Sequence, residues 1–124
     1  KMMKFLCTSV LLLLGLTACS ADEKNQTTTA KKDFDLFCEQ FTIITESADF
    51  SSLTSEQRAA NLDSMLADKV ELSGNAYIAW VAIRNGPPKE RYSLYKNAAT
   101  SVGYTEWNCP AVELHGSEIG SSHE

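Results

Sequence analysis

The sequence predicts an all-α fold, a small bundle of about four helices with a C-terminal closing segment tied by a disulfide. Apolar residues recur at helical spacing from residue 34 to residue 102, and no stretch alternates with the period of two that is typical of strands. Of the cysteines, Cys38 lies on the first predicted helix and Cys109 in the closing segment. We place the domain at residues 33–115, a size at which a hydrophobic core by itself is marginal and a covalent link helps.

Residues 1–18 have the features of a bacterial signal peptide. Lys1 and Lys4 give a positive start, and residues 5–16 form an apolar run. A bilayer-spanning helix needs about 20 apolar residues, so this run is too short to span. The run ends in Leu16-Thr17-Ala18-Cys19, which resembles the lipobox of bacterial lipoproteins.

The lipobox resemblance implies a lipid anchor. In that family the cysteine, here Cys19, becomes the first residue of the mature chain, and its thiol and amino group are acylated. An Asp in the next position is associated with retention in the inner membrane, whereas this chain has Ser20. The resemblance therefore implies an outer-membrane protein that faces the periplasm. The alternative is an ordinary secretory signal with a chance cysteine.

The charge balance limits the partners. The chain carries 11 Lys and Arg against 16 Asp and Glu, a net charge of −5. Removal of Lys1 and Lys4 with the signal peptide leaves nine cationic residues and a balance of −7. Such a protein repels phosphate backbones and anionic lipid surfaces, so we expect no nucleic acid as partner and attachment to the membrane only through the lipid.

Residues 19–32 contain no aromatic or large aliphatic residue, and we predict a flexible tether there. The alternative is that they extend the first helix. We expect that helix to begin at Asp33, whose carboxylate can cap an N-terminus, and to end near Glu46. Its buried face consists of residues at helical spacing: Phe34, Phe37, Cys38, Phe41 and Ile44.

Three further helices are predicted. After a loop at residues 47–53, residues 54–57 (TSEQ) form a capping box that starts the second helix. This helix ends near Glu71. The third covers residues 76–83, which are apolar on every side, and a Gly-Pro-Pro stop follows it. The fourth runs from Pro88 to Gly103. Its core face is Tyr92, Tyr95, Ala98, Ala99 and Val102.

An aromatic segment closes the chain. It contains Tyr104 and Trp107, with a short helix expected over residues 110–114, and we predict that residues 116–124 are a disordered tail. Residues 91–111, with Arg-Tyr at their start and Trp-Asn-Cys-Pro-Ala at their end, resemble small exported helical proteins of no known activity. That resemblance implies only an all-helical fold.

Cys38 and Cys109 are the predicted disulfide. Cys7 leaves with the signal peptide and Cys19 carries the lipid, so two thiols remain in an oxidising compartment. They either pair or stay free. Closing a loop of this length stabilises by about 4 kcal/mol in the chain-entropy model.

No motif indicates catalysis, and we expect no catalytic residue, metal or cofactor. His115 and His123 stand alone near the polar end, where nothing holds a base or a metal. Arg84, Glu90 and Arg91 are interpreted as a surface ion-pair cluster. Trp80 and Trp107 are interpreted as core anchors.

Two functions remain open. The first is a non-enzymatic lipoprotein that presents its helical domain to a protein partner, in an envelope complex or as a toxin-neutralising or chaperone-like protein. The candidate surface for it is Tyr77, Ile78 and Val81, unless the closing segment covers that helix. The second is a small ligand-binding protein or hydrolase with carboxylates (Glu39, Glu46 or Asp49) and a tyrosine between helices.

Overall fold

The structure, a computed structural model, describes the backbone of residues 14–121 and the side chains of residues 28–121. The charged start of the predicted signal peptide, the side chain of Cys19 and His123 lie outside these residues. Within them the chain is helical and contains no strand, which confirms the predicted all-α class.

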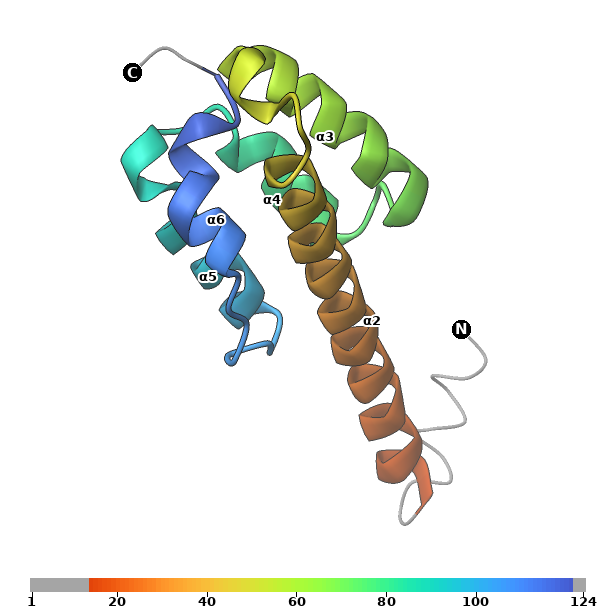
Figure 1. Cartoon of the computed structure of the whole chain (residues 1–124). Coiled ribbons are helices and arrows are strands. Elements are labelled where there is room, and N and C mark those ends of the chain that lie inside the picture. Colours follow the sequence, from red (N-terminus) through yellow and green to blue (C-terminus); the bar gives the residue numbers. More distant parts are fainter. Residues whose placement is uncertain (1–13, 122–124) are drawn as a thin grey trace.

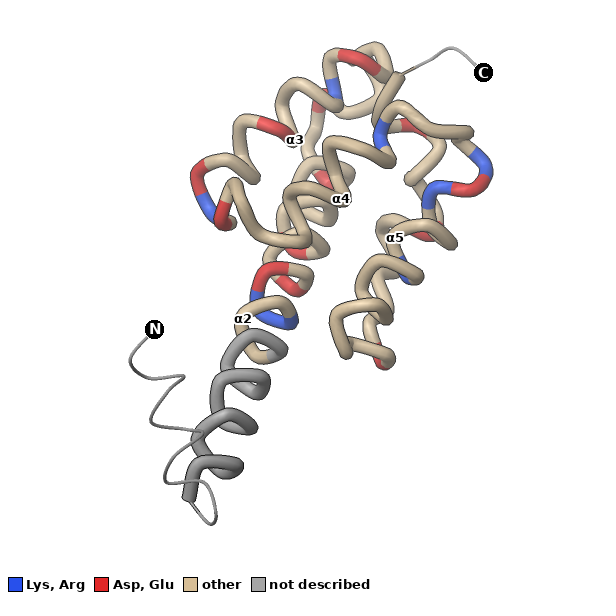
Figure 2. Tube along the Cα trace, turned by 180° about the vertical axis from the view of Figure 1, so that it is seen from behind, with Lys and Arg blue, Asp and Glu red and all other residues tan. Residues whose placement is uncertain are grey.

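The longest element, α2 (Leu14–Thr45), is the axis of the fold (Figure 1). Helix α3 lies on one side of it and helices α5 and α6 on the other, while α4 lies against the remaining side, between α3 and α5 (Figure 2). The elements after α2 are η1 (Phe50–Ser52), α3 (Ser55–Lys69), α4 (Asn75–Ile83), η2 (Pro88–Glu90), α5 (Arg91–Ser101), α6 (Pro110–His115) and η3 (Gly116–Glu118).

Phe37 of α2 is at the centre of the core. Its ring centroid lies 4.9 Å from that of Tyr95, 6.1 Å from Trp80 and 6.3 Å from Trp107. Trp80 and Trp107 are 0% and 1% exposed, so the prediction that both are core anchors is confirmed. Because α4, α5 and the closing segment each contribute one of these rings, a single aromatic cluster joins them to α2.

The predicted start of the first helix is wrong. Asp33 is not an N-cap, because α2 already begins at Leu14 and continues through residues 28–32, which we predicted as part of a flexible tether. Ala30 and Asp33 are each 6% exposed, and they lie one turn before Phe34 and Phe37 on the same buried face. The packing surface of α2 therefore begins at least one turn earlier than its large apolar residues suggest.

The second predicted helix begins where its capping box indicates. The amide of Gln57 donates to Thr54 Oγ1 at 3.1 Å, and the amide of Thr54 donates to Gln57 Oε1 at 2.8 Å. Ala59, Leu62 and Leu66 then form its buried face. Reciprocal satisfaction of two free amides explains why the four residues of this motif were enough to place the start of α3.

The predicted disulfide is confirmed. It joins Cys38 of α2 to Cys109, directly before α6, with the two Cα atoms 5.7 Å apart. The closing segment lies along α2, since Trp107 Nε1 donates to the carbonyl of Phe34 at 3.1 Å and the Tyr104 hydroxyl donates to Asp35 at 2.6 Å. The covalent link and these two bonds hold the same two parts of the chain together.

Residues 116–121 are ordered, so the predicted disordered tail is wrong for this part of the chain. Ile119 is 1% exposed and packs into the core. The amide of Gly120 donates to the Ser55 carbonyl at 3.2 Å, and the amide of Ser121 donates to the Arg84 carbonyl at 2.9 Å. At Gly120, where φ is 147°, a Cβ would lie only 2.5 Å from the Arg84 carbonyl oxygen, so glycine allows this close approach.

Candidate interaction surface

The orientation of α4 is fixed by Asp63 of α3. A single carboxylate oxygen of Asp63 accepts from the Tyr77 hydroxyl at 2.8 Å, from Trp80 Nε1 at 3.0 Å and from Arg84 Nη1 at 3.1 Å. These three donors lie three and four residues apart and therefore share one face of α4. They turn that face towards α3, and the hydrogen bond to Asp63 raises the pKa of Tyr77.

The sequence pattern did not reveal this role of Asp63. Its side chain is 33% exposed and pairs with Arg84, whose side chain is 28% exposed. One signal was available: Tyr77, Trp80 and Arg84 carry their polar groups on one stripe of a helix, and each polar group needs a partner when it is partly buried. Which acidic residue serves as that partner depends on the packing of α3.

With α4 held in this orientation, two residues of the predicted interaction surface point away from the bundle. Ile78 is 54% exposed and Val81 is 37% exposed, while Ala76, Ala79 and Trp80 are buried on the inner side. Tyr77 is half-buried and bound to Asp63. The open part of the predicted stripe therefore consists of Ile78 and Val81.

The closing segment does not cover this side of α4. Trp107 packs on Phe34 with ring centroids 5.9 Å apart, and Tyr104 reaches Asp35, so both aromatic residues contact α2. The alternative in which the closing segment covers the third helix is therefore wrong for Ile78 and Val81, which stay exposed. The disulfide holds the segment on α2, because it joins Cys109, directly before α6, to Cys38 of α2.

The outer side of α4 and the adjacent side of α5 carry no charge, as Figure 2 shows for α4. Arg84 is bound to Asp63, and Lys96 of α5 donates to the Trp107 carbonyl at 3.0 Å, on the side of α6. We call the resulting surface the α4–α5 face. It consists of Ile78, Val81 and Ala82 from α4 with Leu94, Asn97 and Ser101 from α5.

A second constellation, around Arg91, holds the C-terminal segment in place. Arg91 is 0% exposed. Nη1 donates to the carbonyls of Gly116 and Ile119, both at 3.1 Å, and Nη2 donates to those of Gly86 at 3.2 Å and Ser121 at 2.8 Å. Burial lowers the pKa of Arg91. The predicted surface ion-pair cluster of Arg84, Glu90 and Arg91 is therefore wrong.

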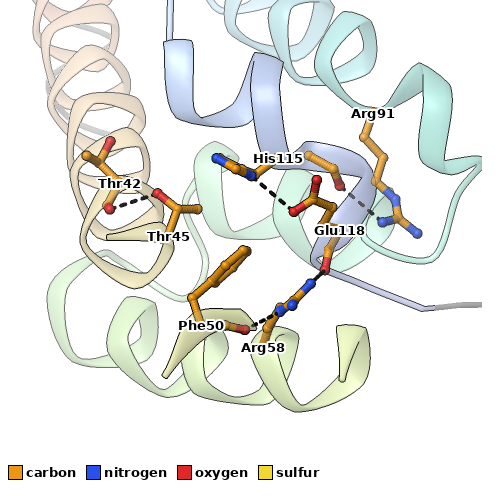
Figure 3. Close-up of polar contacts among 8 residues, drawn as sticks. Thr42, Thr45, Phe50, Arg58, Arg91, His115 and Glu118 are labelled. Atoms are coloured by element: carbon orange, nitrogen blue, oxygen red, sulfur yellow. Dashed lines mark hydrogen bonds and ion pairs between the residues drawn. The ribbon is translucent and has the colours of Figure 1, made fainter. Parts of the chain in front are cut away.

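Arg58 of α3 holds the same segment from another side (Figure 3). Its Nη1 donates to the Glu118 carbonyl at 3.1 Å and its Nε to the Phe50 carbonyl at 2.9 Å. The guanidinium also lies 4.0 Å from the centroid of the Phe50 ring. His115 pairs with Glu118 at 3.0 Å, which gives this histidine a structural contact.

The carboxylates that we considered for catalysis do not converge. Glu39, Glu46 and Asp49 are exposed, and Asp49 accepts from the Ser47 hydroxyl at 3.2 Å. Among the described residues no group of three or more His, Cys, Asp or Glu could hold a metal. A cleft of about 270 Å³ is lined by other residues: Glu56, Ala59, Ala60, Arg84, Asn85, Gly120 and Ser121.

The geometry of the described residues thus defines a small disulfide-linked helical bundle in which the outer side of α4 carries no charged residue. No protein-family model matches the chain, and neither a curated protein nor a solved structure matches it. Within residues 14–121, no helix has the length and apolar character needed to cross a membrane. The arguments for function therefore rest on the residues of this chain.

Proposed function

We propose that this chain is a lipoprotein of the bacterial envelope, anchored through Cys19 at the periplasmic side of the outer membrane, whose helical domain binds a protein through the α4–α5 face. The lipobox at residues 16–19 supports the anchor. The acidic balance of the chain supports attachment by lipid and protein contacts and opposes nucleic acid or an anionic surface as partner.

The exposure of Ile78 is the observation that carries the binding role. More than half of this large aliphatic side chain is in solvent, and Val81 extends the apolar surface by one turn. The helix beneath them is held by the hydrogen bonds to Asp63 and by the buried Trp80. A surface that is already rigid loses little conformational entropy when it binds, which favours its use as an interface.

The anchor is tested by Cys19→Ser in the full chain. Without the thiol no lipid can be attached, so we expect either release of the protein into the soluble periplasmic fraction or an uncleaved precursor in the inner membrane. Membrane fractionation with immunodetection distinguishes these locations. Normal processing and outer-membrane attachment of the variant would contradict the proposal.

The binding role is tested by photo-crosslinking in native membranes. A photoreactive amino acid at Ile78 of the full chain is compared with the same amino acid at Ala67, an exposed residue of α3 outside the α4–α5 face. We expect protein crosslinks at position 78 that are absent at position 67, with the products identified by mass spectrometry. Equal yields at the two positions would contradict a specific interface.

A further inference from the structure

Asn85 has the sequence context of a spontaneous covalent modification. Of the six asparagines in the chain, it is the only one that a glycine follows. The main-chain nitrogen after an asparagine can attack the carbonyl carbon of the asparagine side chain and close a five-membered ring. The side chain of the following residue hinders this attack, and glycine has none. Gly86 is therefore a favourable neighbour for this reaction.

The structure leaves the Asn85 side chain accessible. Asn85 is exposed, and it follows α4 and the C-cap residue Arg84, so it lies beyond the end of the helix. Its amide nitrogen donates to the Val81 carbonyl at 3.4 Å, which is long for an N–H···O bond. It also lines the cleft of about 270 Å³, so solvent reaches it from that side. The side chain can therefore turn towards the main chain at little cost.

The attacking nitrogen, the amide of Gly86, is held by a hydrogen bond to the Ile83 carbonyl at 2.8 Å. This bond belongs to a turn at the end of α4, and such terminal turns open locally far more often than a whole domain unfolds. Once the turn opens, Gly86 can adopt the conformation that ring closure needs, because it has no side chain. The fold therefore slows the reaction but leaves it a route.

We propose that Asn85 is a modification site at which water slowly converts the asparagine into aspartate and isoaspartate; this goes beyond the proposed function and does not depend on it. The Gly86 nitrogen bonds to Cγ of Asn85 and gives its proton to water, while the Cγ–Nδ2 bond breaks, Nδ2 takes up a proton and ammonia leaves. A water molecule then opens the ring. Opening at Cγ gives aspartate, whereas opening at the main-chain carbonyl carbon gives isoaspartate, in which the main chain runs through the side chain.

Isoaspartate lengthens the main chain by one methylene group, at a place that holds the C-terminal segment on both sides. The Arg84 carbonyl accepts from the Ser121 amide at 2.9 Å, and the Gly86 carbonyl accepts from Arg91 Nη2 at 3.2 Å. Arg91 Nη2 also donates to the Ser121 carbonyl at 2.8 Å. An extra methylene between the first two carbonyls disturbs this arrangement. Isoaspartate therefore loosens residues 116–121, whereas aspartate adds only a charge.

The test incubates the purified full chain at neutral pH and follows its peptides by mass spectrometry. Replacement of NH2 by OH raises the mass of the peptide that contains Asn85 by one mass unit, and electron-based fragmentation distinguishes isoaspartate from aspartate. Asn97, which is exposed on α5 and precedes Ala98, is the control within the same sample and should stay unchanged.

Gly86→Ala is the matched variant and should slow the conversion several-fold, because its methyl group hinders the attack. The fold can accommodate this methyl group. Gly86 does not have a positive φ, and a Cβ would lie 3.3 Å from the Ile83 carbonyl oxygen, so a small shift suffices. An unchanged melting temperature verifies that the variant is folded.

The loosening of the C-terminal segment has its own measurement. We expect faster amide hydrogen exchange at Gly120 and Ser121 in the isoaspartate form, separated by chromatography, than in Asn85→Asp. That variant carries the added charge without the extra methylene. Equal exchange in the two forms would overturn the loosening.

Three other results would overturn the modification site. The first is no conversion at Asn85 in the time in which a synthetic peptide of residues 81–89 converts, since the fold would then protect the site. The second is an equal rate at Asn97, which would remove its specificity. The third is an undiminished rate in Gly86→Ala, which would exclude attack by the nitrogen of residue 86. Conversion at Asn85 alone, slowed in that variant, supports the proposal.

Discussion

Two arginines seven residues apart, Arg84 and Arg91, stand on either side of the Pro-Pro turn and have opposite environments. Arg84 is partly exposed and pairs with a carboxylate, Asp63, at 3.1 Å. Arg91 is fully buried, and its hydrogen bonds go to four main-chain carbonyls. The residue with the ion pair is therefore the more exposed one, and the residue in the core has neutral partners.

The difference shows what each arginine contributes. Residues 116–121 contain only the single turn η3, so several of their carbonyls have no helical partner, and buried carbonyls need donors. The planar guanidinium of Arg91 offers five N–H groups in fixed directions and serves four carbonyls from two parts of the chain. Arg91 thus fixes the course of the C-terminal segment, whereas Arg84 contributes to the orientation of α4.

The largest loss of stability is expected on reduction of the disulfide, which holds the closing segment on α2. Reduction of Cys38–Cys109 should lower the free energy of unfolding by about 4 kcal/mol, because the unfolded chain gains the entropy of an open loop. Thermal denaturation with and without reductant measures the loss. Thiol labelling of the unfolded, unreduced protein should detect neither residue, and label on either would contradict the bond.

The comparison of the two arginines is tested most directly by Arg91→Met. It keeps much of the apolar stem but leaves four carbonyls without their donor, so we expect a loss of about 3 kcal/mol or more. Amide hydrogen exchange should show faster exchange at Gly120 and Ser121 than in α3. Arg84→Met is the matched control, and a similar loss in both variants would contradict the difference in role.

A smaller effect is expected at Asp63. Asp63→Ala removes the acceptor shared by Tyr77, Trp80 and Arg84 and should cost about 1 to 2 kcal/mol, because these groups can partly turn to water. Arg84→Met should cost less than about 1 kcal/mol, as a partly exposed ion pair does. Chemical denaturation measures both losses. Because Asp63→Ala also removes the ion pair, a larger loss in Arg84→Met would mean that Arg84 holds α4 through another contact, such as the Trp80 ring, whose centroid lies 5.4 Å from the guanidinium.

Asp33 tests the burial of a carboxyl group that has no ion pair among the described side chains. Burial and the nearby Glu71 raise its pKa, and Lys32 acts in the opposite direction. Below the unfolded pKa of Asp33, both states are protonated and it has no effect. As pH rises from about 4 towards 7, the folded state loses this proton at higher pH than the unfolded state, so stability falls. Asp33→Asn should remove that fall, measured by denaturation across this range.

The smallest effect is expected at Tyr95, one turn after Arg91. Its hydroxyl is one of two buried side-chain polar atoms that find no hydrogen-bond partner among the described residues, the other being Nε of Arg91. Burial raises the pKa of Tyr95. Tyr95→Phe removes an unsatisfied group and should leave stability unchanged or raise it by up to about 1 kcal/mol. A clear loss in thermal denaturation would indicate a bound water at this hydroxyl.

Local patterns in the sequence were sufficient for most of the fold. The periodicity of Phe34, Phe37 and Phe41 predicted the buried face of α2, and the motif at residues 54–57 predicted the start of α3. The count of cysteines predicted the disulfide. Each of these signals is contained in a few neighbouring residues or in composition, so each can be recognised before the helices are packed.

The candidate surface was predicted only in part. The uncharged run from Ala76 to Ile83 identified the helix, but which side of it stays open depends on Asp63, which binds Trp80 and Arg84 from 17 and 21 positions away. The role of Arg91 had one local signal, its spacing of four from Tyr95 and eight from Ala99 on the buried face. That spacing predicts burial, but it does not name the carbonyls that the arginine binds.

The sequence by itself determined the helical class, the apolar faces, the capping box and the disulfide of this protein. The tertiary structure decided the outward side of α4, the order of residues 116–121 and the partners of Asp63 and Arg91. The physical reason is the range of the interactions. Apolar burial follows the period of one helix, whereas a polar side chain binds whichever groups the packing of distant segments brings within about 3 Å.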